Sequence, residues 1–74
     1  MTTFTYYRTR PDGTELTVTG YPTLAQVRRG VALAITDNGL GIRGHATDFS
    51  RSLTLGTPAE FANNTFTITR ENQK

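Results

Sequence analysis

The feature that most constrains the fold of this chain is a repeated alternation of threonine with apolar residues. Fifteen of the 74 residues are threonine, and segments 3–5, 17–19, 52–54 and 65–69 set hydroxyl residues on either side of an apolar one. Because successive side chains of a strand point to opposite faces, each segment predicts a strand with its apolar residue inside and its hydroxyl residues outside. The chain is therefore expected to build a sheet with one buried and one solvated face.

The first two of these segments are predicted to form a hairpin over residues 3–20. Between them lies Arg10-Pro11-Asp12-Gly13, in which proline fixes one turn dihedral, aspartate favours the next corner and glycine accepts a positive φ. A three-residue loop with a glycine bulge then pairs residues 6–8 with residues 16–18. One face of this hairpin is expected to point to the core, through Phe4, Tyr6, Leu16 and Val18. The wetter face is expected to carry Thr5, Tyr7, Thr9, Glu15, Thr17 and Thr19.

Residues 23–37 are predicted to form the one long helix. Thr23-Leu24-Ala25-Gln26 has the spacing of a capping box, in which the Thr and Gln side chains satisfy free backbone groups of the first turn. Asn38 and Gly39 favour a left-handed exit after Asp37. Gly30 predicts a close approach between the helix and a strand. Apolar residues at helical spacing form the stripe that should pack on the sheet: Leu24, Val27, Val31, Ala34 and Ile35.

The rest of the chain gives weaker signals. Residues 38–50 are expected to be a loop, with an additional short strand at 41–47 as the alternative. Strands are expected at 51–55 and 65–70, a single helical turn at 57–61 from a second capping box, and a frayed tail at 71–74. The order β-β-α-β-β predicts one small two-layer α+β domain over residues 1–74. Its sheet is expected to be antiparallel or mixed, with one helix packed on one face.

Composition narrows the class of protein further. Without cysteine there is neither a disulfide nor a cysteine-based zinc site, so a chain this short depends on its small core or on self-association. The net charge is only +2, and the longest apolar stretch, residues 31–35, is far too short to cross a bilayer. We therefore expect a soluble, cytoplasmic protein with no membrane partner.

No set of residues predicts catalysis. His45, Asp48, Ser50 and Ser52 include the residue types of a hydrolytic triad, yet nothing in their spacing holds a base beside a nucleophile. The glycines of segment 39–44 have the spacing of a dinucleotide fingerprint, but they follow the carboxyl end of a helix, whose partial negative charge repels phosphate. One histidine and no cysteine leave a zinc site short of ligands. We predict no enzyme activity, cofactor, metal or small-molecule substrate.

The function expected from these features is protein binding. On the predicted helix, Leu33 lies opposite the core stripe, on an outer face that it shares with Gln26 and Arg29. An exposed leucine beside an arginine suits a docking surface for a partner protein or a second copy, and an unprotected sheet edge is the second choice. The hypothesis is a small binding module, of the kind that viruses and mobile elements encode as accessory proteins, which masks a partner surface or self-associates.

Nucleic-acid binding is the alternative hypothesis. A hairpin and a helix that carry arginine and tyrosine side chains can contact phosphates and stack on bases. Asp12 and Glu15 on the same hairpin count against it, because they repel a polyanion, and so does the small net charge. The residues expected to bind nucleic acid are Tyr7, Arg8, Arg10, Arg28 and Arg29.

Overall fold

The computed structural model describes residues 2–72 and shows a four-stranded antiparallel sheet with two helices. In chain order the elements are β1 (Thr2–Thr9), β2 (Glu15–Tyr21), α1 (Leu24–Asp37), α2 (Arg43–Ser52), β3 (Ala59–Phe61) and β4 (Asn64–Asn72). The strand order is β2-β1-β4-β3, so the first and last strands form the centre of the sheet. The predicted α+β class is confirmed.

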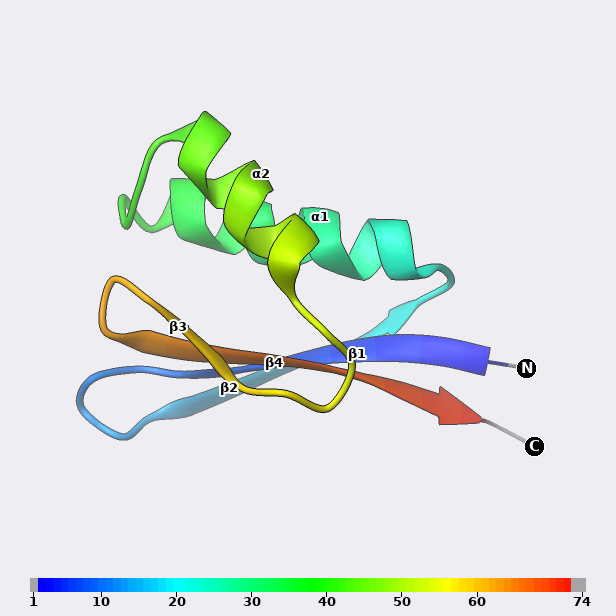
Figure 1. Ribbon diagram of the computed structural model, residues 1–74. Helices are drawn as coiled ribbons and strands as arrows, with labels where there is room; N and C mark the ends of the chain where they lie inside the picture. The colour runs from blue at the N-terminus through cyan, green and yellow to red at the C-terminus, as the bar shows by residue number, and fades with distance from the viewer. Residues whose placement is uncertain (1, 73–74) are drawn as a thin grey trace.

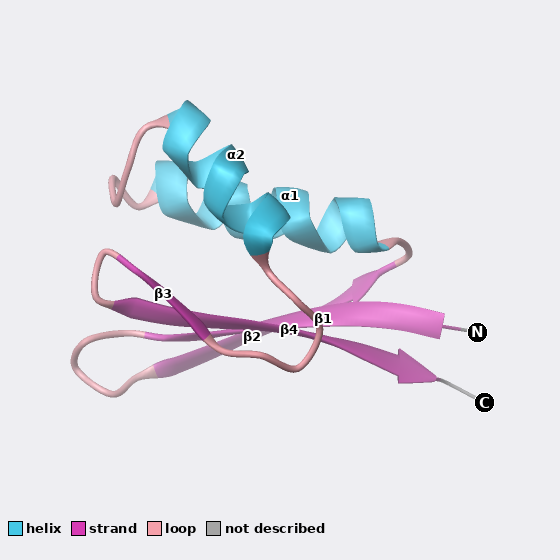
Figure 2. Cartoon of the chain, viewed as in Figure 1, coloured by secondary structure: helices cyan, strands magenta, loops and turns pink. Residues whose placement is uncertain are grey.

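The helices form one layer over one face of the sheet (Figure 1 and Figure 2). α1 packs on the strands, and α2 packs mainly on α1. No helix or strand of the described residues covers the other face of the sheet, which we call the uncovered face. The prediction of a single helix on the sheet was therefore incomplete, because two helices form the layer.

The core lies between this helix layer and the central strands. Phe49 of α2 contacts Phe66 of β4, with ring centroids 5.6 Å apart, and Phe61 of β3, at 5.0 Å. This aromatic cluster ties α2 to β3 and β4 of the sheet. The buried apolar side chains of the core are Tyr6, Val27, Val31, Ile35, Ala46, Leu53, Phe66 and Ile68.

The β1–β2 hairpin has the predicted register across residues 6–8 and 16–18, and the predicted three-residue loop. Arg10 N donates to Thr14 O at 2.8 Å and closes the loop. Inside the loop, Thr14 N donates to a carboxylate oxygen of Asp12, also at 2.8 Å. This bond holds the pKa of Asp12 below its usual value, because it stabilises the charged carboxylate.

A bulge near the end of β2 turns Tyr21 towards the helices. Between the pairs Tyr6–Val18 and Phe4–Tyr21, β2 contains one residue more than β1. Gly20 sits in this bulge with a φ of +92°, which glycine adopts without the steric cost that other residues have. Strict alternation would have put Tyr21 on the uncovered face. The bulge instead brings its ring within 6.1 Å of the Tyr6 ring, measured between centroids.

α1 begins and ends as predicted. The Thr23 side chain accepts a hydrogen bond from Gln26 N at 3.2 Å, as expected of the N-cap. At the other end, Leu40 N donates to Ile35 O at 2.9 Å, the longer bond of a Schellman motif. The centre of the apolar stripe has no exposed surface, at Val27, Val31 and Ile35.

Residues 38–55 contain α2 instead of the predicted loop at 38–50 and strand at 51–55, and the alternative strand at 41–47 is wrong as well. α2 has weak helix formers and no side-chain cap at its start, so its local preference for helix is low. Tertiary packing stabilises it, since Ala46 is completely buried and Phe49 lies against the core. Leu53, expected to be the inward residue of a strand, is buried as the C-cap of α2.

Residues 59–64 belong to a second hairpin, so the predicted helical turn at 57–61 is wrong. β3 pairs with the start of β4, and Ala62 and Asn63 form a two-residue turn with φ of +50° and +65°. Positive φ at both positions describes a type I′ turn, whose twist matches that of the strands. Thr57 and Glu60 have the spacing of a capping box, with Pro58 at the first helical position, but strand pairing with β4 outweighs that local preference.

The last strand is longer than predicted, since β4 runs to Asn72. The frayed tail predicted at 71–74 is therefore wrong for residues 71 and 72. Residues 73 and 74 lie outside the described residues.

The centre of the uncovered face of the sheet is less exposed to solvent than predicted. Thr5 is only 1% exposed although it points away from the helices. Its hydroxyl donates to Thr19 Oγ1 on β2 at 2.9 Å, and Tyr7 OH donates to Glu71 Oε1 on β4 at 3.3 Å. Because the pair Thr5–Thr69 lies between Tyr7 and Glu71 in the register, the tyrosine ring lies across it.

Candidate protein-binding groove

A groove runs between α1 and α2 on the helix layer. It consists of two hollows of about 520 and 350 Å³ that share Arg29, Ala32 and Thr47. We call this surface the α1–α2 groove. Its lining residues are Ala25, Arg28, Arg29, Ala32, Leu33 and Thr36 from α1, and Arg43, Thr47, Ser50 and Arg51 from α2.

The α1–α2 groove is cationic. Four arginines line it, namely Arg28, Arg29, Arg43 and Arg51, and no aspartate or glutamate does. Among residues 2–72, none of these guanidinium groups forms an ion pair with a carboxylate. Their charge is therefore not neutralised within the described chain.

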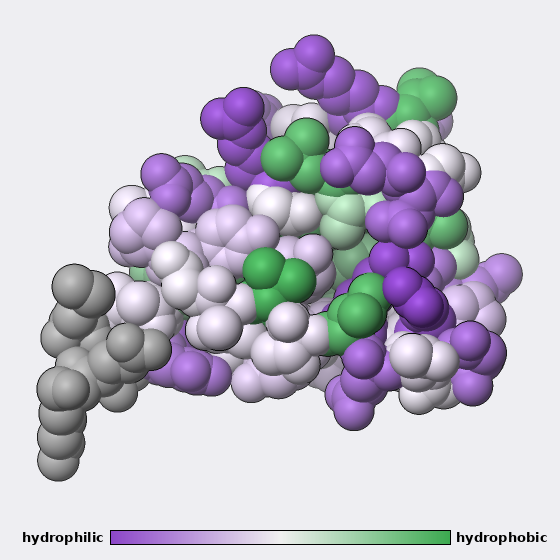
Figure 3. All heavy atoms as spheres, turned by 180° about the vertical axis from the view of Figure 1, so that it is seen from behind, coloured by the Kyte–Doolittle hydropathy of each residue, from purple (hydrophilic) through white to green (hydrophobic). Residues whose placement is uncertain are grey.

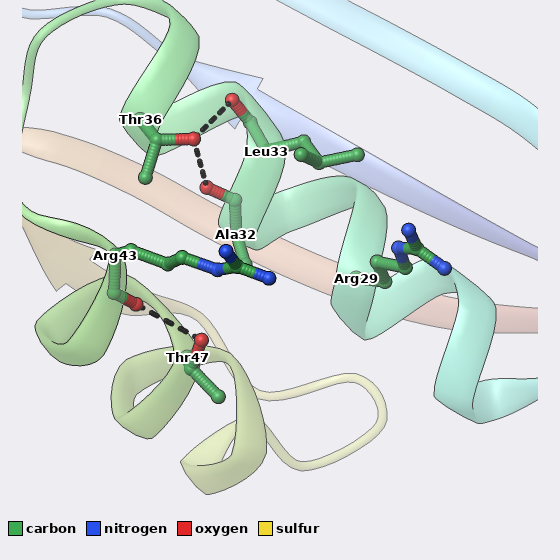
Figure 4. A pocket seen from close by; sticks show the side chains of 6 residues that line it. All are labelled: Arg29, Ala32, Leu33, Thr36, Arg43 and Thr47. Carbon is green, nitrogen blue, oxygen red and sulfur yellow. Dashed lines mark hydrogen bonds between the residues drawn. The ribbon is translucent and has the colours of Figure 1, made fainter.

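The apolar part of the groove comes from α1. Figure 4 shows Arg43 extended from α2 towards α1, with Arg29 and Leu33 on the facing helix. Leu33 is 49% exposed and forms an apolar wall. The hydroxyls of Thr36 and Thr47 donate to carbonyls of their own helices, at 3.2 Å and 2.9 Å. The groove thus combines guanidinium donors with a small apolar surface.

Arg28 has a structural task in addition to its place in the groove. Its Nη2 donates to Leu53 O at 2.9 Å, which ties α1 to the carboxyl end of α2. A cation near the last carbonyls of a helix also interacts favourably with the helix dipole. The three arginines left without a protein partner among the described residues are Arg29, Arg43 and Arg51.

Arg43 does not stabilise the helix in which it lies. It occupies the first turn of α2, where the helix dipole carries partial positive charge, and no acidic residue is present in that turn. Helix stability therefore does not explain a cation here. Residues that break a local stability rule are expected at functional sites, which fits a role in contacting a partner.

The groove contains two of the three residues predicted to bind protein. Arg29 and Leu33 line it together, whereas Gln26 is exposed on α1 and lines neither hollow. Sequence reasoning missed Arg43 and Arg51, because both lie on the helix that it did not predict. The signal was their spacing: residues 43, 47 and 51 follow each other in steps of four and so share one face of a helix.

The residues predicted to bind nucleic acid do not converge. Arg8 is only 6% exposed, and its Nε donates to Asn64 Oδ1 at 3.0 Å. Tyr7 lies on the uncovered face of the sheet, bonded to Glu71. Arg10 lines a separate hollow beside the hairpin, while Arg28 and Arg29 line the α1–α2 groove. The set is therefore divided among three surfaces.

The uncovered face of the sheet carries the opposite charge to the groove. Strand pairing puts three carboxylates on it: Glu15 is opposite Thr9, Glu60 opposite Thr65, and Glu71 opposite Thr3. Within residues 2–72 no arginine shares that face, because the strand arginines Arg8 and Arg70 pair with core residues and face the helices. We call this surface, with Glu15, Glu60 and Glu71 at its margins and threonines between them, the acidic sheet face.

The residues considered for catalysis are engaged in local bonds. Ser50 is 3% exposed and donates to Thr47 O at 2.9 Å, and Ser52 donates to Phe49 O at 2.6 Å. His45 is exposed on α2. In the part of the chain that the structure describes, no three His, Cys, Asp or Glu side chains are grouped to hold a metal ion.

Exposed apolar side chains are dispersed over the surface. On the face seen from behind, apolar residues form separate green spots among pale and purple ones (Figure 3). The large exposed apolar residues are Leu16, Leu33, Ile42 and Leu55. Neither described helix has the length and apolar character needed to cross a bilayer.

Comparison of the chain with protein-family models, with curated proteins and with solved structures finds no match.

Proposed function

We propose that this chain is a small non-enzymatic protein-binding module whose α1–α2 groove takes the acidic sheet face of a second copy. The separation of charge supports this proposal. Arginines without carboxylate partners line the groove in the helix layer, and glutamates lie on the face of the sheet that the helices do not cover. Charges that are not neutralised within one chain attract the complementary surface of another. The module acts by occupying surfaces, not by turnover.

The spacing of the charges also matches. Arg43 and Arg51 are eight residues apart, which corresponds to about 12 Å along a helix. Glu15, Thr9, Thr65 and Glu60 form one row across the four strands. Three steps of about 4.8 Å between strands separate its end carboxylates by about 14 Å. α2 laid across the sheet of another copy therefore brings each arginine near a glutamate.

Such a contact joins two different surfaces, so it is heterologous and extends head to tail. The groove belongs to the helix layer, which lies on the face of the sheet opposite the acidic sheet face (Figure 1), so a bound copy still offers one free surface of each kind. We expect assemblies that lengthen as the protein concentration rises. Since the contact is mainly ionic and solvent-exposed at its rim, salt should dissolve it.

Nucleic acid fits the charge distribution less well. A duplex needs a cationic surface that extends along its backbone, whereas the arginines of the described chain are divided between the α1–α2 groove, the hollow lined by Arg8 and Arg10, and β4. Tyr7, the ring expected to stack on bases, lies on the acidic sheet face. We also propose a cytoplasmic location, because a chain without cysteine makes no use of an oxidising compartment.

Two complementary double variants test the proposal. Arg29→Gln/Arg43→Gln removes two guanidinium groups of the α1–α2 groove, and Glu15→Gln/Glu60→Gln removes two carboxylates of the acidic sheet face, without reversing either charge. Sedimentation velocity at low and high ionic strength (about 20 and 500 mM salt) measures the mass of each protein and of their equimolar mixture. We expect wild type to assemble at low salt and each variant to stay at the monomer mass of 8.2 kDa. The mixture should stop at the dimer, because only one intact groove meets one intact face.

The single change Arg70→Glu is the control for charge. It lowers net charge by two, as Arg29→Gln/Arg43→Gln does, but at an exposed residue outside the groove, and should leave assembly intact. A wild-type protein that stays monomeric at low salt and high concentration would overturn the self-association. Fluorescence anisotropy with a glutamate-rich peptide and with duplex DNA would then show whether the groove takes a foreign acidic protein or a nucleic acid.

A further inference from the structure

A third hollow, which shares Leu33 with the α1–α2 groove, lies between the hairpin and the carboxyl-terminal half of α1. Its volume is about 350 Å³. The hairpin contributes Tyr6, Arg8, Arg10, Leu16 and Tyr21 to its lining, and α1 contributes Leu33 and Asp37 among others. We call this space the hairpin hollow.

The hairpin hollow contains a buried cation without a counterion. Arg8 is only 6% exposed, and its one side-chain hydrogen bond within residues 2–72 joins Nε to the neutral amide oxygen of Asn64. Its two terminal nitrogens have no partner in the described part of the chain. Buried guanidinium groups are normally paired with a carboxylate or another anion, because an unpaired buried charge is costly. The terminal nitrogens of Arg8 are not among the polar atoms that the fold seals from solvent without a partner, so they face the hollow and are open to an anion there.

Other hydrogen-bond donors line the same hollow. The rings of Tyr6 and Tyr21 are 6.1 Å apart, and neither hydroxyl has a partner among residues 2–72. Burial and the neighbouring Tyr21 raise the pKa of Tyr6, while Arg8 acts in the opposite direction. Tyr6 therefore keeps its proton at neutral pH and can donate it to an anion. Arg10 adds a second guanidinium.

The α1 side of the hollow has the opposite polarity. Asp37, exposed at the rim, is the one acidic residue in the lining. It sits in the last turn of α1, where the helix dipole carries partial negative charge. A purely anionic ligand would be repelled on this side, whereas a protonated amine would be attracted. Leu16 and Leu33, which are 38% and 49% exposed, offer apolar contacts.

We propose that the hairpin hollow binds a small zwitterion, namely an amino acid with an aliphatic side chain. The carboxylate lies against Arg8, whose planar fork can hold both oxygens, with Arg10 and the tyrosine hydroxyls around it. The amine lies towards Asp37, and the aliphatic side chain lies on Leu16 and Leu33. This inference departs from the expectation that the chain takes no small molecule, and it does not depend on the α1–α2 groove.

Three probes of similar shape test the proposal by NMR titration of the ¹⁵N-labelled protein. Leucine has the carboxylate and the amine, 4-methylpentanoate lacks the amine, and leucinamide lacks the carboxylate. We expect leucine to shift amides of the hairpin and of the end of α1 with a Kd near the millimolar range. Leucinamide should bind more than about tenfold more weakly, because it leaves Arg8 unpaired. 4-Methylpentanoate should be intermediate.

Substitutions in the lining test whether the NMR shifts arise from binding in the hairpin hollow. Replacing buried Arg8 puts the fold itself at risk, so the test uses Arg10→Gln and Tyr21→Phe, each of which should weaken leucine binding several-fold. Arg70→Gln is the matched control outside the hollow and should leave it unchanged. Absence of any shift at about 20 mM leucine, or equal binding of leucinamide, would overturn the proposal. Equal binding of 4-methylpentanoate would overturn the assignment of the amine to Asp37.

Discussion

The hydroxyl end of the Tyr21 ring lies directly on the backbone of Gly30 in α1. A Cβ atom at Gly30 would approach Tyr21 Cζ to 2.6 Å, far closer than two non-bonded carbon atoms tolerate. The glycine lowers helix stability but lets the ring pack between β2 and α1. The close approach predicted from Gly30 thus has a defined partner, and the bulge at Gly20 is what turns that partner towards the helix.

This contact predicts that Gly30→Ala lowers the stability of the protein when residue 21 is tyrosine and raises it when residue 21 is alanine. In wild type, the added methyl group displaces the Tyr21 ring, and we expect a loss of about 1 kcal/mol or more in the free energy of unfolding. In a Tyr21→Ala background the methyl group meets open space, and helix propensity should raise stability by up to about 1 kcal/mol. Urea denaturation of the four proteins measures the coupling. Equal effects of Gly30→Ala in both backgrounds would show that the ring does not constrain the helix.

The start of α2 offers a second prediction, because its N-cap is Ile42. This residue has the extended backbone of a cap, with φ −82° and ψ 158°, but its side chain cannot accept a hydrogen bond and is 65% exposed. Ile42→Ser should therefore stabilise the protein by about 1 kcal/mol. Ile42→Ala, which removes the same apolar surface without adding a cap, is the control and should give no gain. A serine variant no more stable than the alanine variant would contradict the prediction.

The elements that the sequence predicted correctly are those whose signals are local. The turn around Pro11 and Gly13 and the cap at Thr23 each satisfy their backbone groups within a few residues, so pattern and structure agree. α2 was missed because its signal is not local. Ala46, Phe49 and Leu53 have helical spacing, but the threonine, aspartate and serine residues between them hide the period, and packing on α1 stabilises the helix.

The sequence predicted the part of the candidate site that lies on α1 but not the part that lies on α2. Arg29 and Leu33 follow from the periodicity of α1, which separates its buried stripe from its outer face. Arg43 and Arg51 join them only because α2 packs on α1. Arg8 was expected on a nucleic-acid-binding surface, whereas it is mostly buried and held by Asn64, a placement that depends on how β4 pairs with β1.

Arg43→Glu should separate stability from binding. At the first turn of α2 a carboxylate interacts favourably with the helix dipole where arginine does not, so stability should rise by about 0.5 to 1 kcal/mol at low salt. The same change puts a negative charge into the groove and should abolish assembly. Thermal melts and sedimentation of the same samples measure both effects. If assembly survives the substitution, Arg43 has no part in the contact.

Substitutions in the turn between β3 and β4 should stabilise the protein. Ala62 has a φ of +50°, which costs an alanine roughly 1 kcal/mol relative to residues that tolerate the left-handed region. Ala62→Asn combined with Asn63→Gly gives the pair that type I′ turns prefer, and should raise stability by about 1 kcal/mol. Proline at residue 62 is the opposing control, because its ring fixes φ near −65° and should destabilise the hairpin. Equal melting temperatures for wild type and the Asn-Gly variant would contradict the turn type.

Tyr6 predicts a loss of stability at alkaline pH. Burial and the neighbouring Tyr21 raise its pKa in the folded protein above the ordinary 10.0, so folding favours the protonated phenol. The resulting contribution is fully present below pH 10 and is lost as the pH rises through the raised pKa, because the unfolded chain releases the proton more readily. Urea denaturation at a series of pH values from 8 upwards should show this decline in wild type. The phenylalanine of Tyr6→Phe has no proton to lose, so this variant should show a smaller decline of stability with pH. Tyr7→Phe, on the acidic sheet face, should show the same decline as wild type. An unchanged decline in Tyr6→Phe would mean that another group governs alkaline unfolding.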